Sequence, residues 1–177
     1  MITPDTKDWT WVLGTPCPEC GFDASTARPE DVPAMLRANA AQWQQVLAGP
    51  DARERPRADK WSALEYGCHV RDVCRIFARR LELMLTEDGP LFPNWDQDAT
   101  AVEDRYDSQD PAVVAGELSD AADTLATAFD RVSGEDWTRT GTRSDGARFT
   151  TATFAQYFIH DPVHHLWDVW GTAAPVP

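Results

Sequence analysis

Apolar residues recur three and four residues apart in four stretches of the chain, and this spacing predicts four amphipathic helices. Proline and glycine separate the stretches, because both residues interrupt helices. Two stretches begin at an aspartate that can cap the free N–H groups of a first turn, Asp31 and Asp110, and a proline follows each closely. The predicted helices cover residues 31–48, 62–88, 110–133 and 150–170.

The second stretch has the clearest start. Its opening letters, WSALEY, place Ser62 at the cap and Glu65 three residues later, which is the spacing of a reciprocal capping box. Trp61 before the cap and Tyr66 four residues after it can pack together as a hydrophobic staple. We therefore expect this helix to begin at a well-defined residue.

The connections between the stretches indicate how the helices are arranged. Residues 87–109 are long, acidic and rich in helix breakers, so they are either functional or cross between distant helix ends. A short hairpin or turn is predicted around Asp145-Gly146. The whole pattern favours an all-α four-helix bundle with a long crossover connection.

A length of 177 residues suits one domain, with two small domains as a distant alternative. We expect the bundle to occupy residues 30–177. Residues 1–29 are irregular and are expected to pack on the bundle as a strap, through an apolar run that comprises Trp9, Trp11, Val12 and Leu13.

The formal charge of −13 argues against nucleic acid and anionic membrane surfaces as partners, because both attract lysine and arginine. The sequence contains no run of 18 apolar residues, so no transmembrane helix is predicted. The N-terminus has no basic segment followed by an apolar one, so no secretory signal is expected and a cytoplasmic location is predicted.

The segment FIHDPVHHLWDV (158–169) holds three of the chain's four histidines. His160 and His164 are separated by about 40° around a helix and share a face, whereas His165 is about 140° from His160 and is interpreted as a bystander. Such a pair can grip a transition metal if a further ligand is present. His69 on the second helix is the remaining histidine, and three nitrogen ligands would leave coordination positions open, as a catalytic site requires. The alternative is that the histidines are structural.

Pro162 lies inside the last predicted helix and removes the N–H that would bond the carbonyl of Phe158. We expect a kink rather than a break and restart at Asp161, because the apolar positions keep helical phase through the proline. Three carboxylates are candidates to orient the imidazoles: Asp72, Asp161 and Asp168.

Cys17 and Cys20 form the sequence CPECG, which looks like half of a zinc knuckle. A structural zinc site normally has two such pairs. Cys68 and Cys74 lie about 120° apart on a helix, so they do not easily complete the site together. The favoured interpretation is plain thiols or a surface turn, with a redox pair and a zinc half-site as alternatives.

The segments KWSALEYGCHVRDV (60–73) and HDPVHHLWDV (160–169) resemble the DinB-like superfamily, which includes thiol-dependent S-transferases and mycothiol-dependent maleylpyruvate isomerases. The resemblance covers roughly residues 30–172 and leaves CPECG outside the family pattern. It implies a four-helix bundle with a divalent metal, zinc or nickel. The matching residues are Trp61, Ser62, Glu65, His69, His160 and His164, of which the three histidines are the implied metal ligands.

The resemblance implies an enzyme that transfers a low-molecular-weight thiol, of the mycothiol or bacillithiol type, to an electrophilic small molecule, or a related thiol-dependent isomerase. The partners would be the thiol and the electrophile, and a homodimer stays open. The alternatives are a metal-dependent hydrolase with Asp72 or Asp161 as the base, and a non-enzymatic, structural or stress-associated bundle. No catalytic residue is assigned, and the candidates to hold an anionic substrate are Arg71, Arg75, Arg79 and Arg80.

Overall fold

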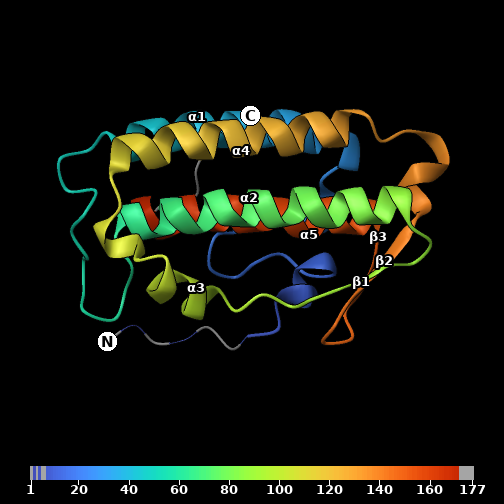
Figure 1. The fold of residues 1–177 in the computed structure, drawn as a ribbon, viewed down its shortest axis with the longest axis horizontal. Coiled ribbons are helices and arrows are strands. Elements are labelled where there is room, and N and C mark those ends of the chain that lie inside the picture. The colour runs from blue at the N-terminus through green and yellow to red at the C-terminus, as the bar shows by residue number, and fades with distance from the viewer. Residues whose placement is uncertain (1, 3, 5–6, 172–177) are drawn as a thin grey trace.

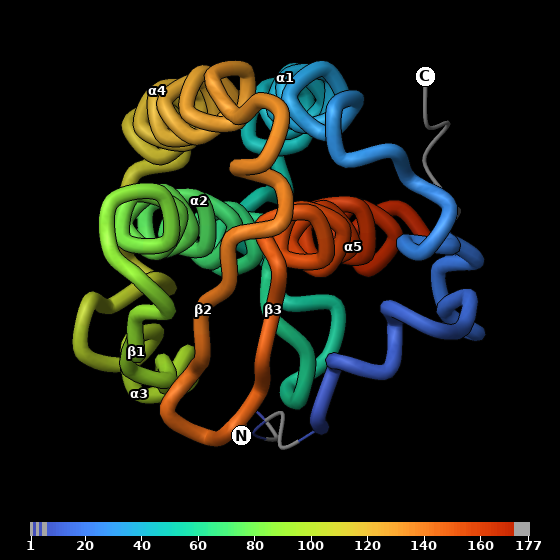
Figure 2. Tube along the Cα trace, turned by 90° about the vertical axis from the view of Figure 1, so that its right-hand side faces the viewer, coloured from blue at the N-terminus to red at the C-terminus, as the bar shows by residue number. Residues whose placement is uncertain are grey.

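A computed structural model describes residues 2, 4 and 7–171 of the chain. Four long helices pack in two layers, with α1 beside α4 in one layer and α2 beside α5 in the other (Figures 1 and 2). The prediction of a four-helix bundle is confirmed. The helices are α1 (Val32–Leu47), α2 (Ala63–Thr86), α4 (Pro111–Asp130) and α5 (Thr151–Trp170).

The start of α2 follows the predicted pattern. The Glu65 N–H donates to the Ser62 hydroxyl over 3.2 Å, and the Ser62 N–H donates to the Glu65 carboxylate over 2.9 Å. The rings of Trp61 and Tyr66 pack edge to face with their centroids 5.5 Å apart. The capping box and the staple are therefore both formed.

The ends of the other helices agree only in part with the predicted ones. Asp110 caps α4 as predicted, accepting from two backbone N–H groups. Asp31 makes no such bond, because its carboxylate pairs with Arg28 instead. The predicted end of this helix at residue 133 is three residues too late: α4 ends at Asp130, and a separate 3-10 turn, η5 (Gly134–Thr138), follows.

The connection between α2 and α4 is the predicted crossover. Both helices run in the same direction, so the chain returns along the underside of the bundle between them (Figure 1). This return contains a strand, a short helix and a 3-10 turn, which are β1 (Leu91–Phe92), α3 (Gln97–Glu103) and η4 (Tyr106–Ser108).

The predicted hairpin around Asp145-Gly146 is formed by β2 (Thr140–Arg143) and β3 (Arg148–Thr150). β1 adds to it in parallel, with Leu91 opposite Thr142, so a small three-stranded sheet of order β1-β2-β3 supplements the helices. A Cβ at Gly141 would lie 2.8 Å from both Met84 and Phe92, so only glycine lets the sheet pack this closely on the end of α2.

The N-terminal segment (residues 7–31) covers one side of α5 below the helix layers (Figure 2). It contains three short 3-10 turns, η1 (Trp9–Leu13), η2 (Ala24–Thr26) and η3 (Pro29–Asp31). Val12 and Ala24 are fully buried, whereas Trp11 remains 37% exposed. The predicted strap therefore packs on the bundle, with Leu13 and Phe22 also lying against the core.

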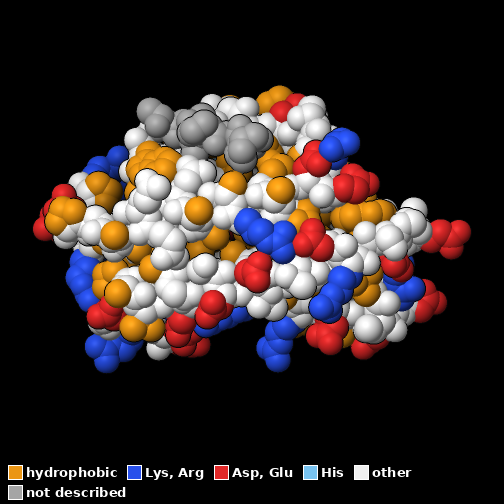
Figure 3. Space-filling model, turned by 90° about the horizontal axis from the view of Figure 1, so that it is seen from above, with side chains coloured by type: hydrophobic (Ala, Val, Ile, Leu, Met, Phe, Trp, Pro, Cys, Tyr) orange, Lys and Arg blue, Asp and Glu red, His pale blue; other side chains and the backbone are white. Residues whose placement is uncertain are grey.

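α5 is continuous through Pro162, so the last helix does not restart at Asp161. The Asn39 amide of α1 donates to the Pro162 carbonyl over 2.9 Å, which ties the two helices together at this point. On the described part of the α1 and α4 face, acidic and basic side chains are interspersed and histidines are not seen (Figure 3). None of the described helices has the length and apolar character needed to cross a membrane.

Candidate metal centres on helix α5

α5 carries two pairs of side chains, each four residues apart and offset from the other by one position. His160 and His164 form one pair, and Asp161 and His165 form the other. One residue turns a helix by about 100°, so the two pairs point in different directions. Among the described residues, each pair meets further metal-ligating side chains from another part of the chain.

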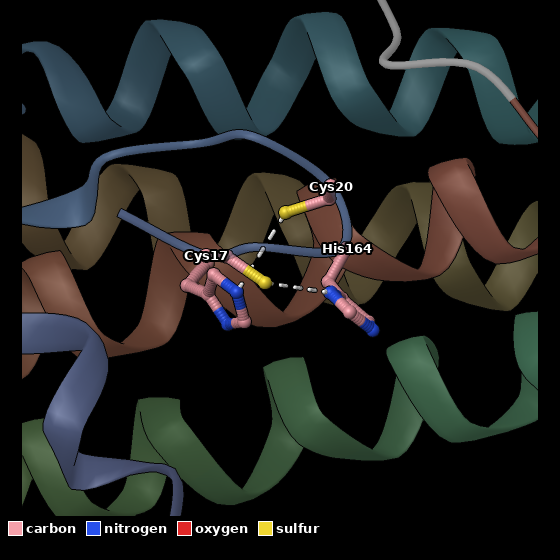
Figure 4. A group of neighbouring side chains, drawn as sticks. Cys17, Cys20 and His164 are labelled. Atoms are coloured by element: carbon pink, nitrogen blue, oxygen red, sulfur yellow. Dashed lines mark hydrogen bonds between the residues drawn. The ribbon is translucent and has the colours of Figure 1, made fainter. Parts of the chain in front are cut away.

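The Cys–His group consists of Cys17, Cys20, His160 and His164. Cys17 Sγ lies 3.6 Å from His164 Nδ1, and Cys20 Sγ lies 3.8 Å from His160 Nε2. Figure 4 shows Cys17 reaching from the N-terminal segment toward His164 on α5, with Cys20 on the same segment beside it. All four ligand atoms lie within 4.8 Å of one another.

A tight turn holds the two cysteines on one side of the N-terminal segment. The Cys17 carbonyl accepts from the Gly21 N–H over 2.8 Å, and the Cys17 N–H donates to the Phe22 carbonyl over 2.9 Å. Gly21 has a φ of 75°, a conformation that glycine adopts without steric cost. Cys17 and Cys20 are only 1% and 3% exposed, so their interpretation as a surface turn is wrong.

Burial keeps the two imidazoles and the Cys20 thiol of the Cys–His group uncharged. It lowers the pKa of His160 to about 4, with the nearby His164 as the next cause, and it lowers the pKa of His164 as well. Burial also raises the pKa of the Cys20 thiol to about 12. The imidazoles are therefore neutral near pH 7, which is the form that binds metal.

The His–Asp group consists of His69, Asp161 and His165. Asp161 Oδ2 lies 3.4 Å from His69 Nε2 and 3.8 Å from His165 Nε2. The other nitrogen of His165, Nδ1, lies 2.9 Å from Asp168 Oδ2. A carboxylate on Nδ1 favours the tautomer with its proton there, so the Nε2 lone pair of His165 faces the group.

Two atoms of the His–Asp group are buried without a hydrogen-bond partner among the described residues, His69 Nδ1 and Asp161 Oδ1. Burial by itself would raise the pKa of Asp161, but the charges of His69 and His165 outweigh it and hold the pKa below its usual range. The ring of Trp95 stacks on His69 with centroids 5.4 Å apart and fixes its orientation. Asp161 Oδ2 faces two imidazole nitrogens, and one carboxylate oxygen with two such nitrogens fits a divalent transition metal.

A cavity of about 1020 Å³ lies beside both groups. Its walls come from the N-terminal segment, α2, α5 and the connection around Trp95. Asp161 and His165 lie on the wall, with side chains 30% and 16% exposed, while His69 is fully buried behind them. A small molecule in the cavity would therefore approach the His–Asp group from the side of α5.

The predicted ligand set of His69, His160 and His164 is divided between the two groups. His160 and His164 share a face, but that face meets the cysteines of the N-terminal segment. His69 meets the neighbouring face, so His165, interpreted above as a bystander, lies beside it with its ring centroid 4.7 Å away. The second pair is present in the sequence as Asp161 and His165, four residues apart, but it combines a carboxylate with an imidazole, so a pattern of histidines alone does not reveal it.

The arginine candidates differ in their surroundings. Arg71 and Arg75 pair with Asp72 and Glu117, and Arg79 is exposed. Arg80 lines the cavity and forms no ion pair with any residue that the structure describes.

Asp72 does not suit the role of a free base. Both of its oxygens are occupied, by Arg71, by Arg75 and by the Tyr106 hydroxyl, which donates over 2.6 Å. Burial would raise the pKa of Asp72, but these donors lower it.

Comparison with solved structures gives a match to YfiT from Bacillus subtilis, described as a probable metal-dependent hydrolase with an unusual four-helix bundle topology. The two chains are 18% identical, with a TM-score of 0.65 over 94% of this chain and 89% of that chain, which shows a shared fold. No curated protein matches significantly in sequence. A family model for the DinB superfamily matches residues 34–169, which is most of the chain. This confirms the resemblance seen in the sequence motifs, and the chain belongs to the DinB superfamily.

Proposed function

We propose that this protein is a metal-dependent enzyme that transfers a low-molecular-weight thiol to an electrophilic small molecule. The observation that carries the proposal is the His–Asp group at the wall of the large cavity. His69, Asp161 and His165 offer two nitrogens and one oxygen, and three protein ligands leave coordination positions for a substrate. This set replaces the three histidines expected from the sequence.

When bound, a divalent ion such as zinc or nickel would lower the pKa of a thiol or water beside it and supply a nucleophile at neutral pH. The chain's own residues prepare the site for this. Asp168 holds His165 through Nδ1, and Trp95 holds the ring of His69 by stacking. Both imidazoles are therefore oriented before any ligand arrives.

Arg80 is suited to bind an anionic group of the substrate or of the thiol. It is 7% exposed, its Nη2 donates to the Pro93 carbonyl over 2.7 Å, and it lies on the rings of Phe77 and Phe92. Burial, followed by repulsion from Arg143, lowers its pKa to about 10, so it stays charged near neutral pH. An anion in the cavity would supply the missing counter-charge.

At the electrophilic carbon, the proposed step forms one bond and breaks one. The thiol gives its proton to solvent, its sulfur lone pair forms a carbon–sulfur bond, and the leaving group departs with the bonding electrons. For an activated double bond, the neighbouring carbon takes up a proton instead. The residues described above bind and orient the reactants in either case.

A metal-dependent hydrolase is the second candidate, because the same ligand set could activate water. A hydrolase benefits from a free carboxylate as general base over the open site. Here Asp161 belongs to the ligand set, Asp168 is hydrogen bonded to His165, and Asp72 is occupied. None of these three carboxylates is free to act as the base, which supports thiol transfer, since a bound thiolate needs none.

The test begins with protein purified without a histidine tag and loaded with zinc or nickel. Mycothiol or bacillithiol is offered together with an epoxide, an alkyl halide or an activated alkene, and the loss of free thiol is followed alongside product mass. We expect thiol consumption in the parent protein, none in His69→Ala, and a raised KM with little change in kcat in Arg80→Met. Ester or amide hydrolysis without thiol loss would favour the hydrolase. No turnover of either kind would favour a non-enzymatic bundle.

A further inference from the structure

We infer that Cys17, Cys20, His160 and His164 form a closed tetrahedral zinc site that fastens the N-terminal segment to α5. This site is separate from the proposed catalytic metal, with which it shares no ligand. Two ligands come from a turn near the N-terminus and two from one helical face near the C-terminus. The two pairs are about 140 residues apart in sequence.

The spacing of the four ligand atoms fits zinc. Bonds of about 2.3 Å to sulfur and about 2.05 Å to nitrogen, at the tetrahedral angle, put a sulfur and a nitrogen ligand about 3.6 Å apart. The observed separations are 3.6 Å for Cys17 and His164 and 3.8 Å for Cys20 and His160. The side chains are thus already placed to receive the ion.

The ligand types select the same metal. A tetrahedral set of two sulfurs and two nitrogens is typical of zinc. A CxxC turn combined with two histidines in neighbouring turns of a helix is a common way to supply it. The CPECG segment therefore provides half of the site, and the helical pair provides the half that no second CxxC supplies.

Burial indicates a structural role for this zinc. The four ligands are between 1% and 6% exposed, and the ring of Trp9 covers both imidazoles with centroids 5.5 Å and 5.1 Å away. Four protein ligands leave no position for a substrate. His164 Nε2, which would face away from the ion, lies 3.6 Å from Glu19 and 3.7 Å from Asp168, the carboxylates expected around a ligating imidazole.

A redox pair fits the same residues less well. A reactive CxxC needs an accessible cysteine whose thiolate is stabilised by nearby positive charge. Both thiols are buried, with exposures of 1% and 3%, and each lies against a neighbouring imidazole of α5. These surroundings favour ligation over thiol exchange.

Zinc at this site would also shape the cavity. The N-terminal segment contributes Lys7, Asp8, Trp9 and Glu19 to the cavity wall. Cys17 lies within this stretch of sequence and Cys20 directly follows Glu19, so an ion bound to both cysteines would hold this wall of the cavity against α5. Loss of the zinc is expected to open one side of the cavity rather than to unfold the helices.

The test uses the full chain, purified without a tag, and zinc as the probe. Zinc bound per chain is measured in the parent, in Cys17→Ser/Cys20→Ser and in His69→Ala. Cys68→Ser is the matched control, because Cys68 is also buried but its Sγ lies 3.5 Å from Gln109 on another side of α2. We expect the double variant to lose one zinc per chain that His69→Ala and Cys68→Ser retain. Equal zinc in all four proteins would overturn the inference.

Cobalt keeps the test decisive if the double variant does not fold. Co²⁺ replacing the zinc in the parent should give the intense visible bands of a tetrahedral site and a thiolate-to-cobalt absorption in the near ultraviolet. The His–Asp group contains no sulfur, so this absorption reports on the Cys–His group alone. Its absence, or a disulfide between the two cysteines in freshly purified protein, would contradict the site. Either result would leave the proposed enzyme function standing.

Discussion

The Cys–His group and the His–Asp group lie on adjacent faces of one helix and differ in what surrounds them. The Cys–His group has four ligands, all nearly buried, and a tryptophan over its imidazoles. The His–Asp group has three ligands, two of which reach the wall of a cavity. Closed coordination stabilises structure, whereas an open position allows chemistry.

The difference arises from a single step along α5. Positions 160 and 164 face the N-terminal segment, and positions 161 and 165 face α2, while all four side chains also reach the cavity wall. Asp168 touches both sides, since its carboxylate bonds to His165 and lies 3.7 Å from His164. One short stretch of helix can thus serve two metals of unlike purpose, and single substitutions can separate them.

The largest expected effect on activity and metal content comes from substituting Asp161 and His160, which are adjacent on α5 but belong to different groups. Asp161→Ala should lower thiol transfer by more than about 100-fold, since a ligand should matter more than the outer partners that typically account for 10- to 100-fold. It should leave the zinc of the Cys–His group in place. His160→Ala should release that zinc and leave the metal of the His–Asp group in place. Metal content and turnover are measured for both, and parallel losses in the two variants would show that the groups are not independent.

Asp168→Asn should weaken both groups at once. The amide keeps the size of the side chain but removes the charge that orients His165 and faces His164. We expect a 10- to 100-fold loss of activity and of zinc affinity, the range typical of outer partners. Competition with a chromophoric chelator measures the affinity. An effect on activity alone would assign Asp168 to the His–Asp group only.

The affinity for zinc should rise with pH more steeply at the Cys–His group. Burial raises the pKa of the Cys20 thiol to about 12, so this thiol is protonated near neutral pH and must lose its proton to bind. Binding therefore releases a proton, and the affinity gains about tenfold per pH unit from this thiol alone. The chelator competition is repeated from about pH 7 to about pH 9 in His69→Ala, where the other group is disabled. A flat profile would contradict thiolate ligation.

The smallest expected effect comes from Ser62→Ala, which removes the cap of α2 without touching either group. It should lower the free energy of unfolding by about 1 kcal/mol, as loss of an N-cap usually does. Urea unfolding measures the change, and metal content should stay as in the parent. This variant is the control for the ligand variants. If reduced stability alone released metal, Ser62→Ala would lose metal as well.

Local signals predicted most of the fold. Ser62 with Glu65 and Asp110 with Pro111 set helix starts through bonds within one turn, so no distant contact was needed to find them. The length of residues 87–109 was enough to expect a crossover. The small sheet was not predicted whole, because β1 pairs with a strand about 50 residues away and two residues carry little pattern of their own.

The candidate sites show the same limit, because spacing within one segment does not predict contacts between segments far apart in the sequence. The spacing of His160 and His164 was sufficient to place them on one face, because helical geometry is local. The structure groups them with the cysteines and not with the predicted His69, since nothing in the spacing tells which segment a face meets. Only packing placed Cys17 and Cys20 against that face and His69 against the next one. The sequence contained every ligand, and the folded chain decided how they are grouped, because ligation depends on distances between segments far apart along the chain.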